Sequence, residues 1–586
     1  MKCCNECCNE KIRENKTRQN KTRQGHWSCT TIAIGKEATV DGSVIVAHSD
    51  DDVSDVRVIY VPAADYPDGA MRPVYYDDAS LGHNPQYNST ELCRYIGTSR
   101  GPGYNTVDYL ESRPLGEIPQ VRHTYAYFDY SYGIMNEKQL MIGECTCGAK
   151  FHPEPEPGKN IFYSSELSRV ALERCSTAKE AVELIGELIE KYGLYGTGET
   201  LLIGDPDEVW VIEMCGYKGE VGSEFSENGT GGLWVAQRVP DAEFFVAANQ
   251  FRIRDIHRDK DKNSKDLMYS ANLFDVCINQ GWLDPSATEL DWVSTVSWGE
   301  YGHPYYSLRR VWRAQSKVAP DLKLSPWVDG GYTRAYPFSV KPGKKLSVAD
   351  VAAIYRDHYE GTEFDLSKGR AAGPFGDPTR YENNPDKGDS FNLNTYYIRG
   401  AWERPLSIYR CGILWINQGR KFLPDPIGGI SWIGLERPEA NCLMPFYAGV
   451  NKLPESFETI NISKFDRNSD WWAFNVVANY ATIKYSYMMQ DIRETQQELE
   501  GATYYAVANF EKEPGKKSSD DLTAFCEDNA KNTVSEWWNL LEKLIVKYND
   551  GCITTENEIM QKVGYPDYWL KDVGYDKGPV RYDKIE

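Results

Sequence analysis

An abrupt change of character at Cys29 most constrains what this chain can fold into. The first 28 residues are polar and basic, and they show no hydrophobic period. From Cys29 onward, apolar residues alternate with small or polar ones, which is the period of a β-strand. Asp41-Gly42 then predicts a tight turn, and residues 44–47 a second apolar strand. We therefore expect a disordered leader followed by a hairpin whose return strand brings residues 48–52 back towards Cys29.

The rest of the chain predicts a layered α+β fold. A run of short strands, a pair of helices and further strands favours this class over alternating βαβ units. The strands are expected at 56–61, 124–130, 139–143, 200–203, 209–213, 232–237, 243–248, 407–417 and 430–435, and the helices at 164–175, 176–192, 307–315, 347–359, 471–500 and 518–546.

Four segments follow from this pattern and from the changes in composition along it. Residues 1–28 form the leader, and residues 29–260 the core. Residues 261–470, richer in loops and aromatic side chains, are expected to continue the core and cover its site. Residues 471–586 carry the last two long helices as a C-terminal extension.

Charge and composition narrow the classes of partner. The net charge of −21, from 65 basic and 86 acidic residues, argues against nucleic acid or an anionic membrane. No run approaches the roughly 18 apolar residues that span a bilayer, and no secretory signal is evident, so a cytoplasmic location is expected. The fifteen cysteines are scattered, which is not typical of a disulfide scaffold. We expect no metal and no cofactor.

Several blocks of sequence resemble one family in the order in which that family carries them. The first is CTTIAIGKEATVDGS over residues 29–43, and the second is YGIMNE over 132–137 with IGE over 142–144. Further blocks lie at 199–213, 234–240, 248–252, 307–312, 359–376 and 404–410. Together they resemble the PepD-type cysteine dipeptidases among the N-terminal-nucleophile (Ntn) hydrolases.

The resemblance implies a fold and a reaction. The fold would be a four-layer αββα sandwich of the Ntn-hydrolase type, with the C-terminal helices added to it. The reaction would be the hydrolysis of small peptides, dipeptides in particular, without a metal. Whether the subunits assemble into a homo-oligomer stays open.

Cys29 is the candidate nucleophile. A thiol at a chain start lies beside an α-amine whose pKa is about 7.7–8.0, so the amine can accept the thiol proton at neutral pH. The thiolate would attack an amide carbonyl and form a thioester acyl-enzyme. The α-amine of Cys29 is free to act as this base only if residues 1–28 are removed. The resemblance implies that the nucleophile cleaves the bond before it, as is common among the Ntn hydrolases. The alternative is an ordinary half-buried strand cysteine.

The returning strand supplies three supporting candidates. The resemblance implies an Arg and an Asp near the nucleophile and its amine. We assign Asp51 to hold the ammonium group or the substrate amine, with Asp50 and His48 binding substrate beside it. His48 stands where an Arg is expected, and its charge would depend on pH.

Donors for an oxyanion and for a substrate carboxylate come from elsewhere in the chain. Asn136 and Asn249, at predicted strand ends, are the oxyanion candidates. Arg252 and either Arg309 or Arg310 could bind the substrate carboxylate bidentately. The alternatives are turn-capping amides for the two Asn residues and structural ion pairs for the Arg residues.

Three other functions stay open. An acylase acting on N-acyl amides, like the penicillin and bile-salt amidases, would keep the chemistry and change the substrate. A carbohydrate-active enzyme would use paired carboxylates, which the many aromatic and acidic residues permit. A processed scaffold or binding protein would leave Cys29 inert.

Overall fold

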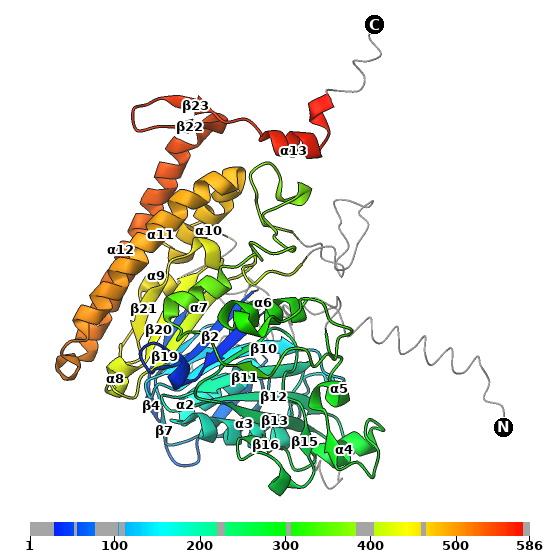
Figure 1. Cartoon of the computed structure of the whole chain (residues 1–586). Coiled ribbons are helices and arrows are strands. Elements are labelled where there is room, and N and C mark those ends of the chain that lie inside the picture. Colours follow the sequence, from blue (N-terminus) through cyan, green and yellow to red (C-terminus); the bar gives the residue numbers. More distant parts are fainter. Residues whose placement is uncertain are drawn as a thin grey trace.

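The computed structural model describes residues 29–51, 56–76, 104, 112–219, 229–300, 306–381, 403–458 and 464–577. The predicted leader, residues 1–28, lies outside the described residues. Within them the fold is a mixed α+β arrangement built on two large antiparallel sheets (Figure 1).

The first sheet contains the predicted hairpin at its centre. Strands β1 (Thr30–Ile34) and β2 (Val44–Asp50) pair antiparallel, and Thr31 lies opposite His48. The turn between them uses Gly42 at φ +82°, a conformation that glycine adopts without steric cost. The seven-stranded order is β18 (Ser339–Val340), β14 (Phe244–Ala247), β1, β2, β19 (Ile413–Gly419), β20 (Ile430–Leu435) and β21 (Met444–Tyr447).

The second sheet has eight strands, and most of them are buried along their whole length. Its order is β16 (Leu267–Tyr269), β13 (Gly231–Val239), β12 (Val209–Tyr217), β11 (Gly198–Gly204), β10 (Met141–Cys147), β9 (Gly133–Asn136), β8 (Tyr127–Asp129) and β3 (Ile59–Val61). Four small two-stranded sheets join β4 (Ala64–Asp65) to β7 (His123–Thr124), β5 (Met71–Tyr75) to β6 (Pro114–Pro119), β15 (Ile256–His257) to β17 (Glu289–Leu290), and β22 (Cys552–Thr554) to β23 (Met560–Lys562).

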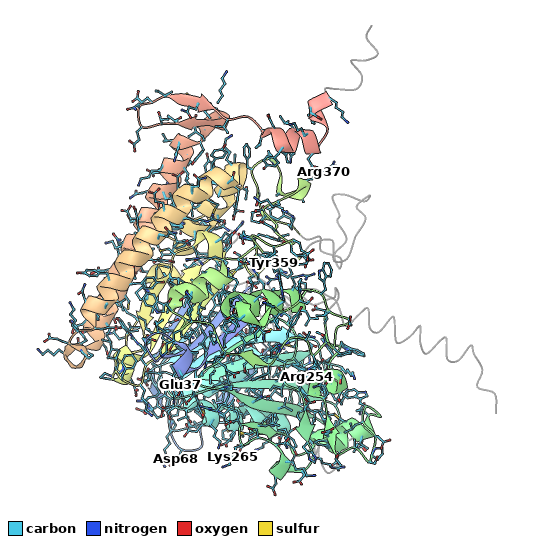
Figure 2. All side chains as sticks on the ribbon, viewed as in Figure 1. Glu37, Asp68, Arg254, Lys265, Tyr359 and Arg370 are labelled. Atoms are coloured by element: carbon cyan, nitrogen blue, oxygen red, sulfur yellow. The ribbon has the colours of Figure 1, made fainter. Side chains whose placement is uncertain are left out.

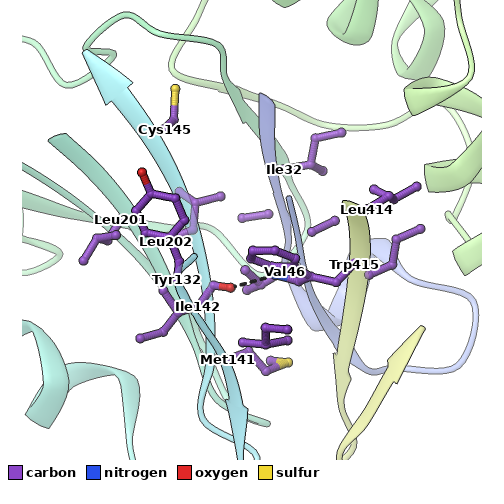
Figure 3. Close-up of a cluster of buried hydrophobic side chains, with 14 of the residues drawn as sticks. Ile32, Val46, Tyr132, Met141, Ile142, Cys145, Leu201, Leu202, Leu414 and Trp415 are labelled. Atoms are coloured by element: carbon purple, nitrogen blue, oxygen red, sulfur yellow. Dashed lines mark hydrogen bonds between the residues drawn. The ribbon is translucent and has the colours of Figure 1, made fainter. Parts of the chain in front are cut away.

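The two large sheets pack against each other through β10, which contacts β1, β2 and β19. The Trp415 indole N–H crosses the interface and donates to the Ile142 carbonyl oxygen at 3.0 Å (Figure 3). The Asn417 side-chain amide likewise donates to the Ile134 carbonyl oxygen at 3.0 Å. These hydrogen bonds fix the register of one sheet on the other, because an unpaired polar group in this dry interface would cost about 1–3 kcal/mol.

Helices contact both sheets. Helix α3 begins with a capping box between Thr177 and Glu180, which fixes its first turn. Helices α2 (Ser164–Arg174) and α3 (Ala178–Tyr192) lie against the eight-stranded sheet, whereas α6 (Leu308–Val318) contacts β14 and α7 (Val348–Tyr355) contacts β19. Shorter helices are α4 (Leu273–Asn279), α5 (Trp292–Val296), α8 (Asp425–Gly428), α9 (Glu455–Glu458) and α13 (Asp567–Asp572).

The C-terminal helices pack on the edge of the first sheet. Helices α10 (Asp470–Ala481), α11 (Tyr485–Phe510) and α12 (Ser519–Lys547) contact one another, and α12 lies on β21 (Figure 1). The prediction of one helix over 471–500 was wrong. A 3-10 turn at Thr482–Lys484 separates α10 from α11, and the Thr482 hydroxyl donates to the Asn479 carbonyl oxygen there, so a local side-chain bond accompanies the break.

Other predicted elements are shorter than expected. The predicted strand 56–61 covers only Ile59–Val61, and the predicted helix 347–359 ends at Tyr355, before Tyr359 at φ +66° leaves the helical region. The predicted strand 407–417 begins only at Ile413. The hairpin β22–β23 and helix α13 follow α12 and were not predicted.

The surface and the interior separate as expected for a folded chain. In Figure 2, Asp68 and Lys265 lie at the periphery, whereas Tyr359 is buried and its hydroxyl donates to the Arg404 carbonyl oxygen at 2.5 Å. The ten cysteines that the structure describes are all free thiols. In the described part of the chain, no helix combines the length and the apolar character needed to cross a membrane.

The closeness of the two sheets generates a stability prediction. A Cβ on Gly143 would lie 2.5 Å from Thr31 Oγ1 and 3.3 Å from the Ala47 carbonyl oxygen. We expect Gly143→Ala to lower the free energy of unfolding by about 1–3 kcal/mol, because the sheets must separate to admit the methyl group. Urea denaturation measures this change.

Gly501, inside α11, provides the matched control. Nothing lies within 4 Å of the position that its Cβ would take. Gly501→Ala is therefore expected to stabilise the protein by about 0.5–1 kcal/mol. Equal unfolding midpoints for the two variants would contradict the close packing at Gly143.

Candidate active site

Cys29 lies immediately before β1, at the end of the central hairpin. Its side chain is 5% exposed, and its thiol lies 3.8 Å from an Asp50 carboxylate oxygen at the end of β2. Thr30 pairs with Ser49, so Cys29 and Asp50 occupy the next positions of the same ladder. The hairpin therefore brings the predicted nucleophile and the predicted acidic residue together.

His48 projects from β2 towards the second sheet. The backbone N–H of Glu144, on β10, donates to His48 Nδ1 at 2.9 Å. Burial lowers the pKa of His48 to about 3, so the ring is neutral at ordinary pH. An imidazolium in this unexposed position would lose its hydration, so the structure does not favour the pH-dependent charge expected for His48.

Acidic side chains surround the thiol. Glu144 is fully buried, accepts a hydrogen bond from Thr146 at 2.9 Å, and interacts with Glu199 and Cys29. Burial raises the pKa of Glu144, against these hydrogen bonds. Burial also raises the pKa of the Cys29 thiol well above its usual value, and the charges of Glu144 and Asp50 raise it further. A thiol in this environment is held as the neutral, weakly nucleophilic form.

Arg310 holds the backbone of the nucleophile. Its guanidinium donates to the Cys29 carbonyl oxygen at 2.8 Å and to the Thr30 hydroxyl at 3.0 Å. The same group donates to Asn249 Oδ1 at 2.7 Å and to the Ala248 carbonyl oxygen at 3.2 Å. Arg310 therefore joins the chain at Cys29 to the turn after β14, and these donors are engaged within the protein.

Asn249 lies beside Cys29 in a strained conformation, with φ +65°. Its backbone N–H donates to Cys145 Sγ at 2.6 Å, and its side-chain amide donates to the Thr146 carbonyl oxygen at 2.8 Å. A primary amide has two hydrogens, so one hydrogen bond leaves a second donor on Asn249.

Asp51 contacts Arg404 in a short, fully buried ion pair, and Ser49 donates to it at 3.2 Å. Arg410 donates to the Asp51 carbonyl oxygen. Sequence reasoning placed Asp51 near the nucleophile and did not identify Arg404, although the block at 404–410 contained it. Only the fold shows that this block supplies the counter-charge.

Three of the predicted residues serve other parts of the fold. The Asn136 side-chain amide donates to the Leu172 and Cys175 carbonyl oxygens, so neither hydrogen remains for an oxyanion. Its role is that of a turn-capping amide. Arg252 donates to the Tyr336 and Pro337 carbonyl oxygens.

Arg309 likewise makes contacts within the protein. It pairs with Glu403 at 3.1 Å, and its guanidinium lies 3.6 Å from the centroid of the Phe364 ring. Such stacking suits a buried structural arginine. The structure therefore brings Cys29, His48, Asp50, Asp51, Asn249 and Arg310 together and leaves Asn136, Arg252 and Arg309 in structural contacts.

Glu144 and Glu199 are two further residues that sequence reasoning did not single out, besides Arg404. Both belonged to blocks that carried the resemblance, at 142–144 and 199–213. The interaction of Glu144 with Cys29 depends on the stacking of the two sheets, and that of Glu199 with Glu144 on the pairing of β10 with β11. The local pattern gives no signal for either.

Donor atoms of Cys29, His48 and Asp50 lie within 4.8 Å of one another, a spacing that a metal ion could bridge. The hydrogen bond at His48 does not fit this use. Because Nδ1 accepts the Glu144 N–H, the neutral ring carries its hydrogen on Nε2, and neither nitrogen offers a lone pair to a metal. The donor set is better suited to covalent chemistry at the thiol.

Comparison with known proteins identifies the family. The profile of peptidase family C69 matches residues 105–498, more than half of the chain. The chain belongs to peptidase family C69. It is therefore a hydrolase of the cysteine-peptidase class, as the sequence predicted.

Relatives of this C69 peptidase are named as dipeptidases. A probable dipeptidase of Latilactobacillus sakei is 25% identical over 460 residues, covering 76% of this chain and 79% of that protein. Dipeptidase A of Lactobacillus helveticus is 23% identical over 475 residues, covering 78% and 82%. A penicillin V acylase from Agrobacterium tumefaciens overlaps 72% of this chain and 86% of its own at 10% identity, and its TM-score of 0.25 is too low to bear on the fold.

Glu300 generates a pH prediction, because it clamps the start of the helix that carries Arg310. Its carboxylate accepts the backbone N–H groups of Ser307 at 2.8 Å and Leu308 at 2.7 Å. Burial raises the pKa of Glu300 to about 7, although these bonds and the charge of Arg310 oppose the shift. A raised carboxyl pKa means that ionisation costs stability as pH rises from about 4.5 to 7.

We expect the stability difference between wild type and Glu300→Gln to shrink by about 3 kcal/mol between pH 5 and pH 8. The variant cannot ionise, so only the wild type bears this cost. Urea denaturation of both proteins at the two pH values measures it. Glu208→Gln, at a half-exposed ion pair with Arg238, is the control. If the stability difference between wild type and Glu300→Gln is the same at pH 5 and pH 8, the raised pKa of Glu300 is contradicted.

Proposed function

We propose that this C69 peptidase is a dipeptidase whose nucleophile is Cys29, exposed as the N-terminal residue when residues 1–28 are removed. The observation that carries the proposal is the placement of the Cys29 thiol: it is buried at the end of a central strand, and Arg310 holds its carbonyl oxygen. The dipeptidase names of the relatives support the substrate class.

We propose an α/β/β/α order of layers for the catalytic part. Support comes from the face-to-face sheets, with α2 and α3 against one sheet and α6 and α7 against the other.

Removal of the leader would change the electrostatics of the thiol. While residue 28 is attached, burial and then the anionic neighbours raise the pKa of the Cys29 thiol, which favours its protonated form. The free neutral α-amine could accept the thiol proton. The resulting ammonium group would place a positive charge beside the sulfur and favour the thiolate, so cleavage of the leader would also activate the thiol.

The reaction would follow in two steps. The Cys29 thiolate attacks the scissile carbonyl, the carbon–nitrogen bond breaks, and the leaving amine takes the proton held by the α-amine. Water then hydrolyses the thioester. The second amide hydrogen of Asn249 is the proposed donor to the oxyanion.

The acidic side chains fit a substrate with a free amine. Asp50 lies closest to the thiol, and Asp51 is fixed by Arg404 behind it. An N-acyl substrate has no cation to place beside them, so the charge balance favours a dipeptide over an acylated amide.

The decisive experiment combines processing and activity. Intact mass and N-terminal sequencing of the purified protein should show a new terminus at Cys29, and alkylation of the thiol should abolish dipeptide hydrolysis. Cys29→Ala is expected to retain residues 1–28 and lower kcat by at least about 10⁴-fold, because the nucleophile is absent. Cys552→Ser, at the half-exposed hairpin, should keep full activity.

Other outcomes would redirect the proposal. Hydrolysis of N-acyl amides without hydrolysis of free dipeptides would favour the acylase. An uncleaved terminus together with alkylation-resistant activity would remove Cys29 from the mechanism and point to the carboxylates. A processed protein that shows no hydrolytic activity even before alkylation would indicate an inert Cys29.

A further inference from the structure

The His48 ring is fixed on all sides by the packing of the two sheets. Its centroid lies 4.3 Å from that of Trp415 and 5.7 Å from that of Tyr132. The ring is fully buried, and its Nδ1 accepts the Glu144 backbone N–H. A flip of the ring would break this hydrogen bond, so the bond favours one orientation.

The bond to the backbone also fixes where the ring hydrogen resides. A peptide N–H can only donate, so Nδ1 must present its lone pair. The neutral imidazole then carries its hydrogen on Nε2. Because the donor belongs to the peptide group, no pH change between 5 and 8 alters this assignment.

The Nε2 atom has no hydrogen-bond partner among the residues that the structure describes. The nearest carboxylate oxygen, Glu144 Oε2, lies 3.9 Å away, which is too far for a hydrogen bond. A buried donor without a partner is costly, and such groups concentrate where a ligand completes them.

A molecule bound next to the Cys29 thiol is the candidate acceptor for the Nε2 hydrogen. A ring nitrogen of His48 lies within 4.8 Å of Cys29 Sγ, and Glu144 interacts with both residues. Thr31 lies opposite His48 in the hairpin ladder, so Cys29, two residues earlier on the same face, is its diagonal neighbour.

We infer that His48 is a neutral hydrogen-bond donor to the scissile carbonyl oxygen of the substrate, through its Nε2 hydrogen. This role rests on the proposed function. When the thiolate attacks, the sulfur–carbon bond forms and the carbonyl π electrons move onto oxygen. The His48 hydrogen stays on Nε2 and stabilises the oxyanion without being transferred.

The alternatives for His48 require a form that the structure does not offer. A general base needs a free lone pair on the ring, but the Nδ1 lone pair accepts the Glu144 N–H and Nε2 carries the hydrogen. A cation needs protonation of Nδ1, which would set two donors against each other at the Glu144 amide. The titratable groups that face the ring are Cys29, Asp50, Tyr132 and Glu144.

Two substitutions of His48 test the roles of its two ring nitrogens separately. In His48→Asn, the amide oxygen can replace Nδ1 as the acceptor for Glu144, but no donor reaches the place of Nε2. In His48→Gln, the amide nitrogen reaches the place of Nε2. We expect kcat for a dipeptide to fall about 10²–10³-fold in His48→Asn and less than about tenfold in His48→Gln, with KM nearly unchanged in both.

His257→Asn is the matched control. His257 Nδ1 accepts the Asp259 backbone N–H at 3.0 Å, the same local bond, but the residue lies half-exposed in β15. Its kcat should equal that of wild type. Each variant is first checked for a Cys29 terminus and an unchanged unfolding midpoint, so a loss of activity reports on the donor.

A spectroscopic measurement on the wild type does not depend on any variant folding. In enzyme labelled with ¹⁵N-histidine, the His48 signals should show hydrogen on Nε2 alone and should not titrate between pH 5 and pH 8. Titration in this range, hydrogen on Nδ1, or wild-type kcat in His48→Asn would each overturn the inference. A processed wild type without turnover would overturn the proposed function and this role together, whereas an active wild type with an unaffected His48→Asn would overturn this role alone.

Discussion

The approach of β10 to the central hairpin is the contact on which the rest of the site depends. It requires a residue without a side chain at Gly143, because Thr31 Oγ1 and the Ala47 backbone occupy the space where a Cβ would be. This closeness lets the Glu144 amide reach His48 and lets the Trp415 indole reach Ile142 (Figure 3). A wider gap would admit water, return the charge of His48 to its ordinary pH range, and separate Glu144 from the thiol.

The same closeness explains the electrostatics around Cys29. Buried carboxyl groups gather near a thiol that already carries a raised pKa, and the cations nearby are engaged in other contacts: Arg310 with backbone carbonyls and Arg404 with Asp51. An ammonium group, from the released chain or from a substrate, would add a positive charge beside the thiol and favour the thiolate. This would connect the proposed cleavage of the leader with the proposed preference for a free amine.

Much of the fold could be predicted from local pattern. The alternation after Cys29 and the Asp41-Gly42 turn predicted the hairpin, and the helical period predicted α3 and α12 nearly to their ends. The pattern could not show the break at Thr482–Lys484, because apolar residues on both sides keep a helical spacing. Asn136 likewise looked like a site residue, since a strand-end amide reads the same whether it caps a turn or faces a substrate.

The sequence by itself determined the position of the proposed nucleophile, because Cys29 and Asp50 meet through a hairpin whose turn and register are local. It also placed the chain in its family, through blocks in a fixed order. Only the tertiary structure decided the charge and the contacts of the residues around Cys29. His48 is neutral, Arg310 holds the backbone, and Glu144 reaches the thiol because strands and helices about 100 to 280 residues apart in the chain pack together. The burial that results from such long-range packing sets each protonation state, and no local pattern encodes it.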